Sequence, residues 1–180
     1  MDAGGKVERS RRRDIGASIF AYAISGFVLA YYVVSIFIKG EFDTPLGEAL
    51  GGGVPITELT AKQMVMCGIA IGIRVLGLAG LVVVLTLAAR NMIRGNFFTL
   101  ANARYFSAAC LLLLAAGVGW YVEAMADNWY SSAIGYDEWS GSVAAPLEFV
   151  VFYVFLLTLS LMAVAVRRGV RMQEDVDGLV

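Results

Sequence analysis

The sequence predicts an all-α integral membrane protein with a bundle of four transmembrane helices. Three observations predict it: the composition, the lengths of four apolar runs, and the sorting of the basic residues. Of the 180 residues, 59% are hydrophobic, and the mean hydropathy is +0.72. An ordinary soluble domain is about 45–50% apolar, and one small core cannot hide the excess. A bilayer must therefore take the remainder.

Four apolar runs are long enough to cross about 30 Å of hydrocarbon at about 1.5 Å per helical residue. They cover residues 15–38, 63–89, 105–126 and 147–166. No Pro/Gly linker divides two cores and no repeat of fixed period is present. We therefore expect one domain over residues 1–180, with a tail at 167–180.

Basic residues gather on one side of these runs. Eleven of the 14 Lys and Arg residues lie before the first run, between the second and third, or after the fourth. The opposite loops hold only Lys39 and Lys62. Because cytoplasmic loops carry the excess of Lys and Arg, both termini are predicted to be cytoplasmic. The absence of processing motifs favours a bacterial plasma membrane.

The first run follows the basic segment SRRRD, so a cleaved signal peptide is the alternative to a helix. Its apolar part is too long for a signal peptide, and no convincing A-x-A site precedes Lys39. We expect an uncleaved helix. The acidic, glycine-rich segment 39–63 lacks the Lys-Ser/Thr of a phosphate-binding loop, and it is expected to be a flexible surface loop.

The second run contains one arginine, Arg74, inside GIAIGIRVLGLAGLVVVL. A central arginine costs about 2.5–3.5 kcal/mol, whereas roughly thirteen Leu, Ile and Val residues return about 4–8 kcal/mol, so the helix inserts. The expected acidic partner is Glu123, with Glu148 second and the hydroxyl of Tyr121 assisting. Three interpretations stay open: a structural ion pair, a ligand or anion site that opens outward, or pairing between protomers of a homo-oligomer.

Small residues in the second and third runs give weaker predictions about helix packing and bonding between cysteines. Gly68 and Gly72 form a G-x-x-x-G pair that would admit a second close helix. Cys67 and Cys110 differ in depth by roughly 15 Å, so neither a disulfide nor a shared metal site is expected.

The segment IRGNFFTLANARYF between the second and third runs predicts a tight turn. Gly95 can adopt the left-handed conformation that ends a helix, while Arg90 and Arg94 complement the negative end of that helix. Thr99 can cap the next helix through its hydroxyl. The second and third helices should therefore be antiparallel neighbours.

The loop before the fourth run is rich in aromatic residues, which are typical of an interfacial belt, with a binding lid as the alternative. They are Trp129, Tyr130, Tyr136 and Trp139. Pro146 suits the first turn of the fourth helix, and the carboxylate of Glu148 suits the positive end of the helix dipole.

Two motifs lie on the side predicted to be cytoplasmic. The first, G-x-x-F-T-x-x-N, and the second, G-x-x-L-Q-x-x-x-D-x-x-V, fall on Gly95, Phe98, Thr99, Asn102, Gly169, Gln173, Asp177 and Val180. Together they resemble a bacterial membrane-protein family, the domain of unknown function 2975. Met172 replaces the leucine of the second motif. The resemblance implies four helices and a role beside a small helix-turn-helix regulator, but it assigns no activity.

The chain contains no histidine, which excludes histidine-based zinc sites, bis-histidine haem and Ser-His-Asp triads. No carboxylate spacing matches a catalytic motif, so we expect no enzyme, cofactor or metal site. The basic N-terminus predicts contact with anionic lipid rather than nucleic acid. Two hypotheses remain: an accessory protein that binds a regulator or membrane complex through residues 95–102 and the tail, or an oligomeric transporter or ligand sensor built on Arg74.

Overall fold

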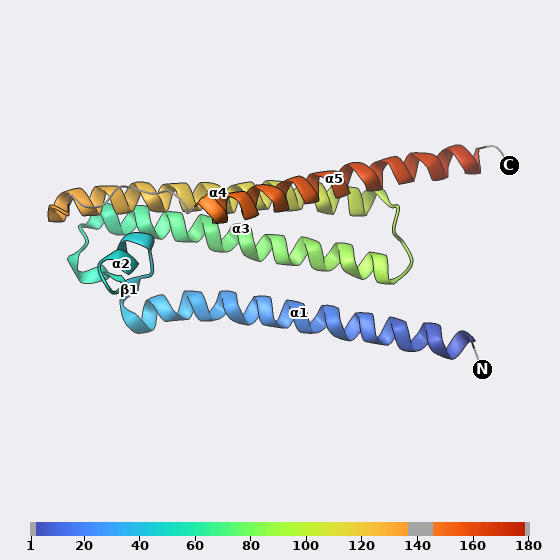
Figure 1. Ribbon diagram of the computed structural model, residues 1–180, viewed down its shortest axis with the longest axis horizontal. Coiled ribbons are helices and arrows are strands. Elements are labelled where there is room, and N and C mark those ends of the chain that lie inside the picture. Colours follow the sequence, from blue (N-terminus) through green and yellow to red (C-terminus); the bar gives the residue numbers. More distant parts are fainter. Residues whose placement is uncertain (1–2, 137–145, 179–180) are drawn as a thin grey trace.

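Four long helices make up most of the described structure. The computed structural model describes residues 3–136 and 146–178 and contains α1 (Ala3–Lys39), α3 (Ala61–Ile93), α4 (Leu100–Ile134) and α5 (Pro146–Asp177). Within these residues, four helices are long and apolar enough to cross a membrane, which confirms the predicted fold class. The central pair is α3 and α4, which lie antiparallel; α5 packs on α4, and α1 packs mainly on α3 (Figure 1).

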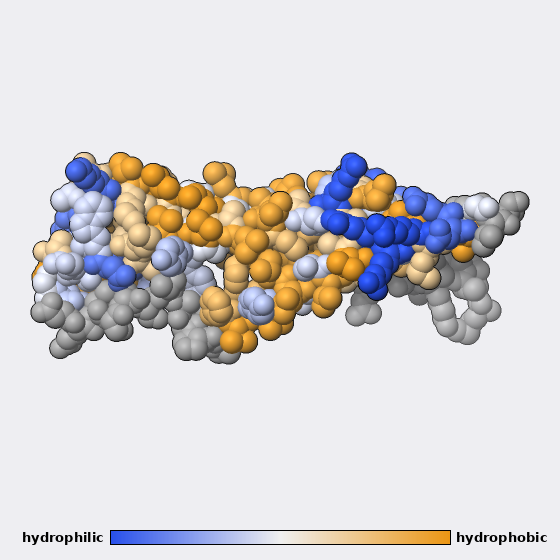
Figure 2. Space-filling model, turned by 90° about the horizontal axis from the view of Figure 1, so that it is seen from above, coloured by the Kyte–Doolittle hydropathy of each residue, from blue (hydrophilic) through white to orange (hydrophobic). Residues whose placement is uncertain are grey.

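The two ends of the molecule differ in charge. Both termini lie at the end that holds the turn between α3 and α4 (Figure 1). An apolar belt covers the middle of the molecule and hydrophilic residues cover its ends (Figure 2). The exposed arginines of the terminal end are Arg90, Arg94, Arg104, Arg167, Arg168 and Arg171. The chain therefore crosses the apolar belt an even number of times.

All four helices extend beyond the apolar runs that predicted them. The 33 residues of α3 span about 50 Å, well beyond about 30 Å of hydrocarbon. The backbone N–H of Gln63 donates to the Thr60 hydroxyl, and the Gln63 side chain accepts from the Thr60 backbone in return. The predicted tail also belongs to a helix, because α5 continues unbroken to Asp177. The boundaries of these helices are set by capping residues and helix-breaking residues rather than by the ends of the apolar runs.

Close packing between α3 and α4 depends on glycines other than the predicted pair. A Cβ at Gly77 would lie 2.9 Å from the carbonyl oxygen of Leu112, and one at Gly119 would lie 2.8 Å from that of Ala70. Nothing lies within 4 Å of the corresponding positions at Gly68 and Gly72. The expectation that the G-x-x-x-G pair admits a close helix was wrong, because that pair faces away from the described helices.

The predicted flexible loop after α1 is a folded cap, which corrects that expectation. The cap consists of β1 (Glu41–Phe42), α2 (Pro45–Ala49), β2 (Val54–Pro55) and the 3-10 helix η1 (Ile56–Glu58), with β1 and β2 paired antiparallel. Leu46 is fully buried, and its backbone N–H donates to Asp127 Oδ2 at 3.1 Å. Glu58 accepts from the Tyr130 hydroxyl at 2.7 Å. The cap is thus bonded to α4.

The aromatic loop after α4 is shorter than the sequence predicted. The helix continues to Ile134, and Gly135 ends it in the left-handed conformation at φ 69°. Tyr130 is buried against the cap rather than placed in an interfacial belt, whereas Trp129 is exposed. Trp139 lies outside the described residues. Pro146 begins α5, as predicted.

Candidate functional site

The candidate site is built around the expected pair of charges, which the fold brings together. Arg74 Nη1 donates to Glu123 Oε2, and the two side chains are 20% and 2% exposed. Helical side chains lean toward the N-terminus of their own helix, so Arg74 on α3 reaches toward the cap while Glu123 on antiparallel α4 leans away from it. Glu123 lies one turn nearer the cap than Gly119, which packs against the backbone of Arg74, and the opposed lean brings the two charged groups together. Both charges find their partner in one chain, so the pair requires no second protomer.

Gly119 allows the two helices to approach at this pair. It lies one turn before Glu123 on α4, and a Cβ there would lie 2.8 Å from the backbone nitrogen of Arg74. That nitrogen and the carbonyl oxygen of Ala70 are backbone atoms, which cannot move aside without separating the helices. The close contact between Arg74 and Glu123 therefore depends on the absence of a side chain at residue 119.

Tyr32 of α1 completes the surroundings of the guanidinium. Its ring centroid lies 4.9 Å from Arg74 Cζ, within the range of a cation–π contact. The hydroxyl of Tyr121 was expected to assist Arg74, but Tyr121 is exposed and lines a different pocket beside Phe149 and Phe152. Tyr32 has no local sequence signal, because hydropathy does not show at which level α1 packs along α3.

Two buried polar atoms beside Arg74 have no hydrogen-bond partner among the described residues. They are the hydroxyl of Tyr32 and Oε1 of Glu123. A buried polar group without a partner costs about 1–3 kcal/mol, and the large majority of such groups in native proteins are bonded.

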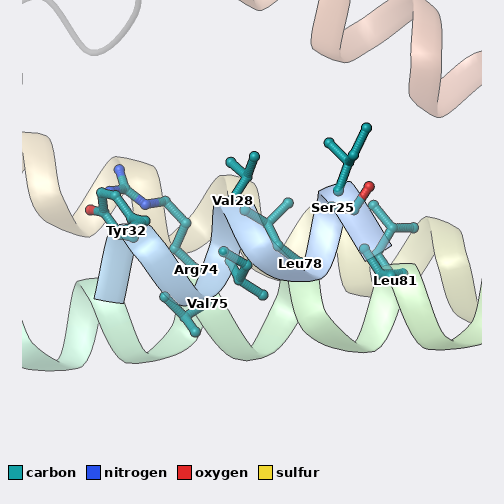
Figure 3. A pocket seen from close by; sticks show the side chains of 10 residues that line it. Ser25, Val28, Tyr32, Arg74, Val75, Leu78 and Leu81 are labelled. Atoms are coloured by element: carbon teal, nitrogen blue, oxygen red, sulfur yellow. The ribbon is translucent and has the colours of Figure 1, made fainter. Parts of the chain in front are cut away.

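An open groove between α1 and α3 leads to this polar centre. The groove has a volume of about 520 Å³. We call it the α1–α3 groove, and its lining residues are Ile24, Ser25, Val28, Leu29, Tyr32, Arg74, Val75, Leu78, Leu81 and Val82. Tyr32 and Arg74 lie at one end of it, and Ser25 and Leu81 lie at the other (Figure 3). The groove is thus polar at one end and mainly aliphatic along its length.

The polar end lies near one boundary of the hydrocarbon. Arg74 precedes Arg90 by 16 residues on α3, a rise of about 24 Å. If the arginine-bearing end marks one boundary of about 30 Å of hydrocarbon, the backbone of Arg74 lies about 6 Å inside the other. Because its side chain extends toward the cap, the guanidinium lies close to headgroup level.

Asp127 is a buried carboxylate whose role the sequence did not predict. It lies one turn beyond Glu123 on α4, and this i, i+4 spacing by itself indicates no more than the acidic end of a helix. Instead it accepts the hydrogen bond of the cap described above. The only signal in the sequence was the shared face with Glu123. The side chains of Glu148 and Asp177, and all of Val180, lie outside the described residues.

The predicted motif residues of the inner turn have structural roles. Gly95 has φ 89°, and the Thr99 hydroxyl accepts from the backbone N–H of Asn102 at 3.2 Å, as expected. The fully buried amide of Asn102 donates to the carbonyl oxygens of Asn96 and Phe97 at 2.7 and 2.9 Å. Its oxygen accepts from the Asn91 side chain at 3.0 Å. The first motif thus specifies the turn.

The two motifs meet at the surface of this end. A Cβ at Gly169 would overlap the ring of Phe98, so the present packing of that ring on α5 requires a glycine there or a shift of the ring. A groove beside this contact is lined by Phe98, Gly169, Met172, Gln173 and Val176, and we call it the tail groove. Met172 and Val176 are 68% and 62% exposed. Phe98 and Gln173 are motif residues whose side chains are exposed in this groove.

No family model, no curated protein and no solved structure matches this chain. Function must therefore be argued from the geometry. Among the described residues, no group of three or more Cys, Asp and Glu side chains is placed to hold a metal ion. Cys67 and Cys110 are both free thiols.

Proposed function

We propose that this chain is a non-enzymatic accessory protein of a bacterial plasma membrane, with its arginine-bearing end in the cytoplasm. The support for this orientation is that the exposed arginines lie with both termini at one end, opposite the acidic cap. Positive charge is retained on the cytoplasmic side of multi-pass membrane proteins. Reporters fused to each terminus should both be active in the cytoplasm, and an extracellular signal from either would refute the orientation.

The protein acts on its partner through the tail groove. The main support is that Met172 and Val176 are exposed. They lie one helical turn apart on the part of α5 that extends beyond Arg167. Val176 lies nine residues past that arginine, about 13 Å along the helix. Apolar side chains that project beyond the hydrocarbon remain in water unless a partner covers them.

The partner is a protein with an apolar anchor and acidic flanking residues. The apolar anchor suits Phe98 and Met172, and the acidic flanks suit the exposed Arg168 and Arg171 beside them. Electrostatic complementarity of this kind fixes orientation more than it adds affinity. A small regulator, as the motif resemblance implies, is one protein of that class.

Site-directed photo-cross-linking in cells tests this proposal. A photoreactive residue at Val176 should yield one discrete protein adduct, and the same residue at Val164, on the exposed face of the span, should yield lipid adducts. Met172→Glu should abolish the protein adduct, because it places a charge in the groove without touching the core. Lipid or self adducts alone from Val176, or an adduct that Met172→Glu leaves unchanged, would refute the proposed surface.

A ligand sensor built on Arg74 is the second candidate function. The α1–α3 groove favours it, since Arg74 and Tyr32 line its polar end and offer hydrogen-bond donors there. The α1–α3 groove is bordered by the exposed residues Ile24 and Val28, so a ligand would enter it from the bilayer. This arrangement favours sensing over transport, and proteoliposomes of the protein should show no substrate uptake that depends on Arg74.

A further inference from the structure

We propose that the α1–α3 groove binds one phospholipid from the leaflet at the cap end, with an acyl chain along the groove. Its phosphate accepts hydrogen bonds from Arg74 and Tyr32. The inference gives a ligand class to the second candidate function and rests on that site. It is independent of the tail groove.

The body of the groove has the dimensions of a lipid chain site. Between Tyr32 and Ile24 the groove follows eight residues of α1, a length of about 12 Å. Its volume of about 520 Å³ lies within the range of about 300–1,000 Å³ that small-molecule sites occupy. Apart from Ser25, the lining below the polar end consists of Ile, Val and Leu side chains. An aliphatic chain that enters sideways from the bilayer fits such a wall.

The polar end matches a phosphate in chemistry and in depth. A guanidinium has five N–H donors, and the described hydrogen bond to Glu123 uses one of them. The Tyr32 hydroxyl is a second donor and lacks a partner. Because the guanidinium lies near headgroup level, a phosphate can reach both donors while its acyl chain follows the groove toward the bilayer centre.

Native mass spectrometry of the full-length protein tests the inference with three lipids of identical acyl chains. The probes are phosphatidylethanolamine, phosphatidylcholine and diacylglycerol, which lacks the phosphate. Wild-type protein should bind one phosphatidylethanolamine or one phosphatidylcholine about tenfold or more tightly than diacylglycerol, as hydrogen bonds to charged groups imply. Equal affinity for diacylglycerol and either phospholipid would overturn the proposal.

Variants then locate the bound lipid. Val28→Trp fills the groove, whereas Val34→Trp on the same helix lies outside it; the two valines are 58% and 50% exposed. Only Val28→Trp should lose the bound phosphatidylethanolamine. Tyr32→Phe should weaken binding about tenfold yet leave the lipid-free melting temperature unchanged, since the hydroxyl has no protein partner. Equal binding by both Trp variants, or unchanged binding by Tyr32→Phe, would overturn the assignment.

The result is separable from the proposed accessory function. The photo-cross-link from Val176 should survive Val28→Trp, because the groove and the tail groove lie at different levels of the molecule. Loss of lipid binding with an intact cross-link confirms that the two surfaces act separately. Loss of the cross-link in Val28→Trp would contradict their independence.

Discussion

A double-mutant cycle at Arg74 and Glu123 tests whether the two charges stabilise the fold as a unit. Glu123→Leu leaves a guanidinium without its partner, and Arg74→Leu leaves a carboxylate that is 2% exposed. Breaking a buried ion pair by removing one partner costs about 3–5 kcal/mol, whereas replacing both partners with apolar residues is often neutral. We therefore expect each single variant to be destabilised by about 3–5 kcal/mol and the double variant to recover most of that loss.

Alkylation of Cys67 measures these differences in detergent. Cys67 is 5% exposed, so a thiol-reactive dye labels it only when the helices separate. Cys110→Ala removes the half-buried second thiol from the background. A chain of this size shifts its melting temperature by about 2–4 °C per kcal/mol, so each single variant should melt about 6–20 °C lower. Additive losses, with a coupling energy below about 1 kcal/mol, would refute the reasoning.

Three further substitutions test the packing, the turn and the cap. Gly119→Ala should lower the free energy of unfolding by about 1–3 kcal/mol, because the added Cβ meets backbone atoms of α3. Its control is Gly72→Ala, which has open space around it and should leave the free energy of unfolding unchanged in the same alkylation assay. Asn102→Ala leaves two turn carbonyls without donors and should cost about 2–4 kcal/mol in that assay; an unchanged melting temperature would contradict the role assigned to the amide. Asp127→Ala leaves the backbone N–H of Leu46 unpaired, so limited proteolysis should cut the cap faster while the spans stay intact, and equal cleavage rates would show that the hydrogen bond does not hold the cap.

Sequence reasoning located the helices and the ion pair because both follow from strong local signals. Four long apolar runs predict four spans regardless of packing, and a short capped turn makes α3 and α4 neighbours, which leaves Glu123 as the acid nearest Arg74. The roles of Gly95 and Thr99 could also be predicted, since glycine is favoured just after the end of a helix and threonine just before the start of one. These features depend on a few consecutive residues.

The features that sequence reasoning missed depend on contacts between distant segments. Strands of two residues have no hydropathy period, so the cap between α1 and α3 resembled a flexible loop. Gly119 and Gly68 look alike in sequence, and only the helix rotation places one against Arg74 and the other toward open space. Tyr32 could not be assigned to the site without the position of α1 along α3.

The location of Arg74 separates membrane insertion from folding. Helix α3 is synthesised before α4, so it must enter the bilayer while Glu123 is still absent. Its roughly thirteen Leu, Ile and Val residues return about 4–8 kcal/mol against about 2.5–3.5 kcal/mol for the arginine, so insertion does not need the pair. The ion pair forms only when α4 packs through Gly119. The carboxylate therefore acts on the assembly of inserted helices, and Tyr32 of α1 completes the polar centre that results.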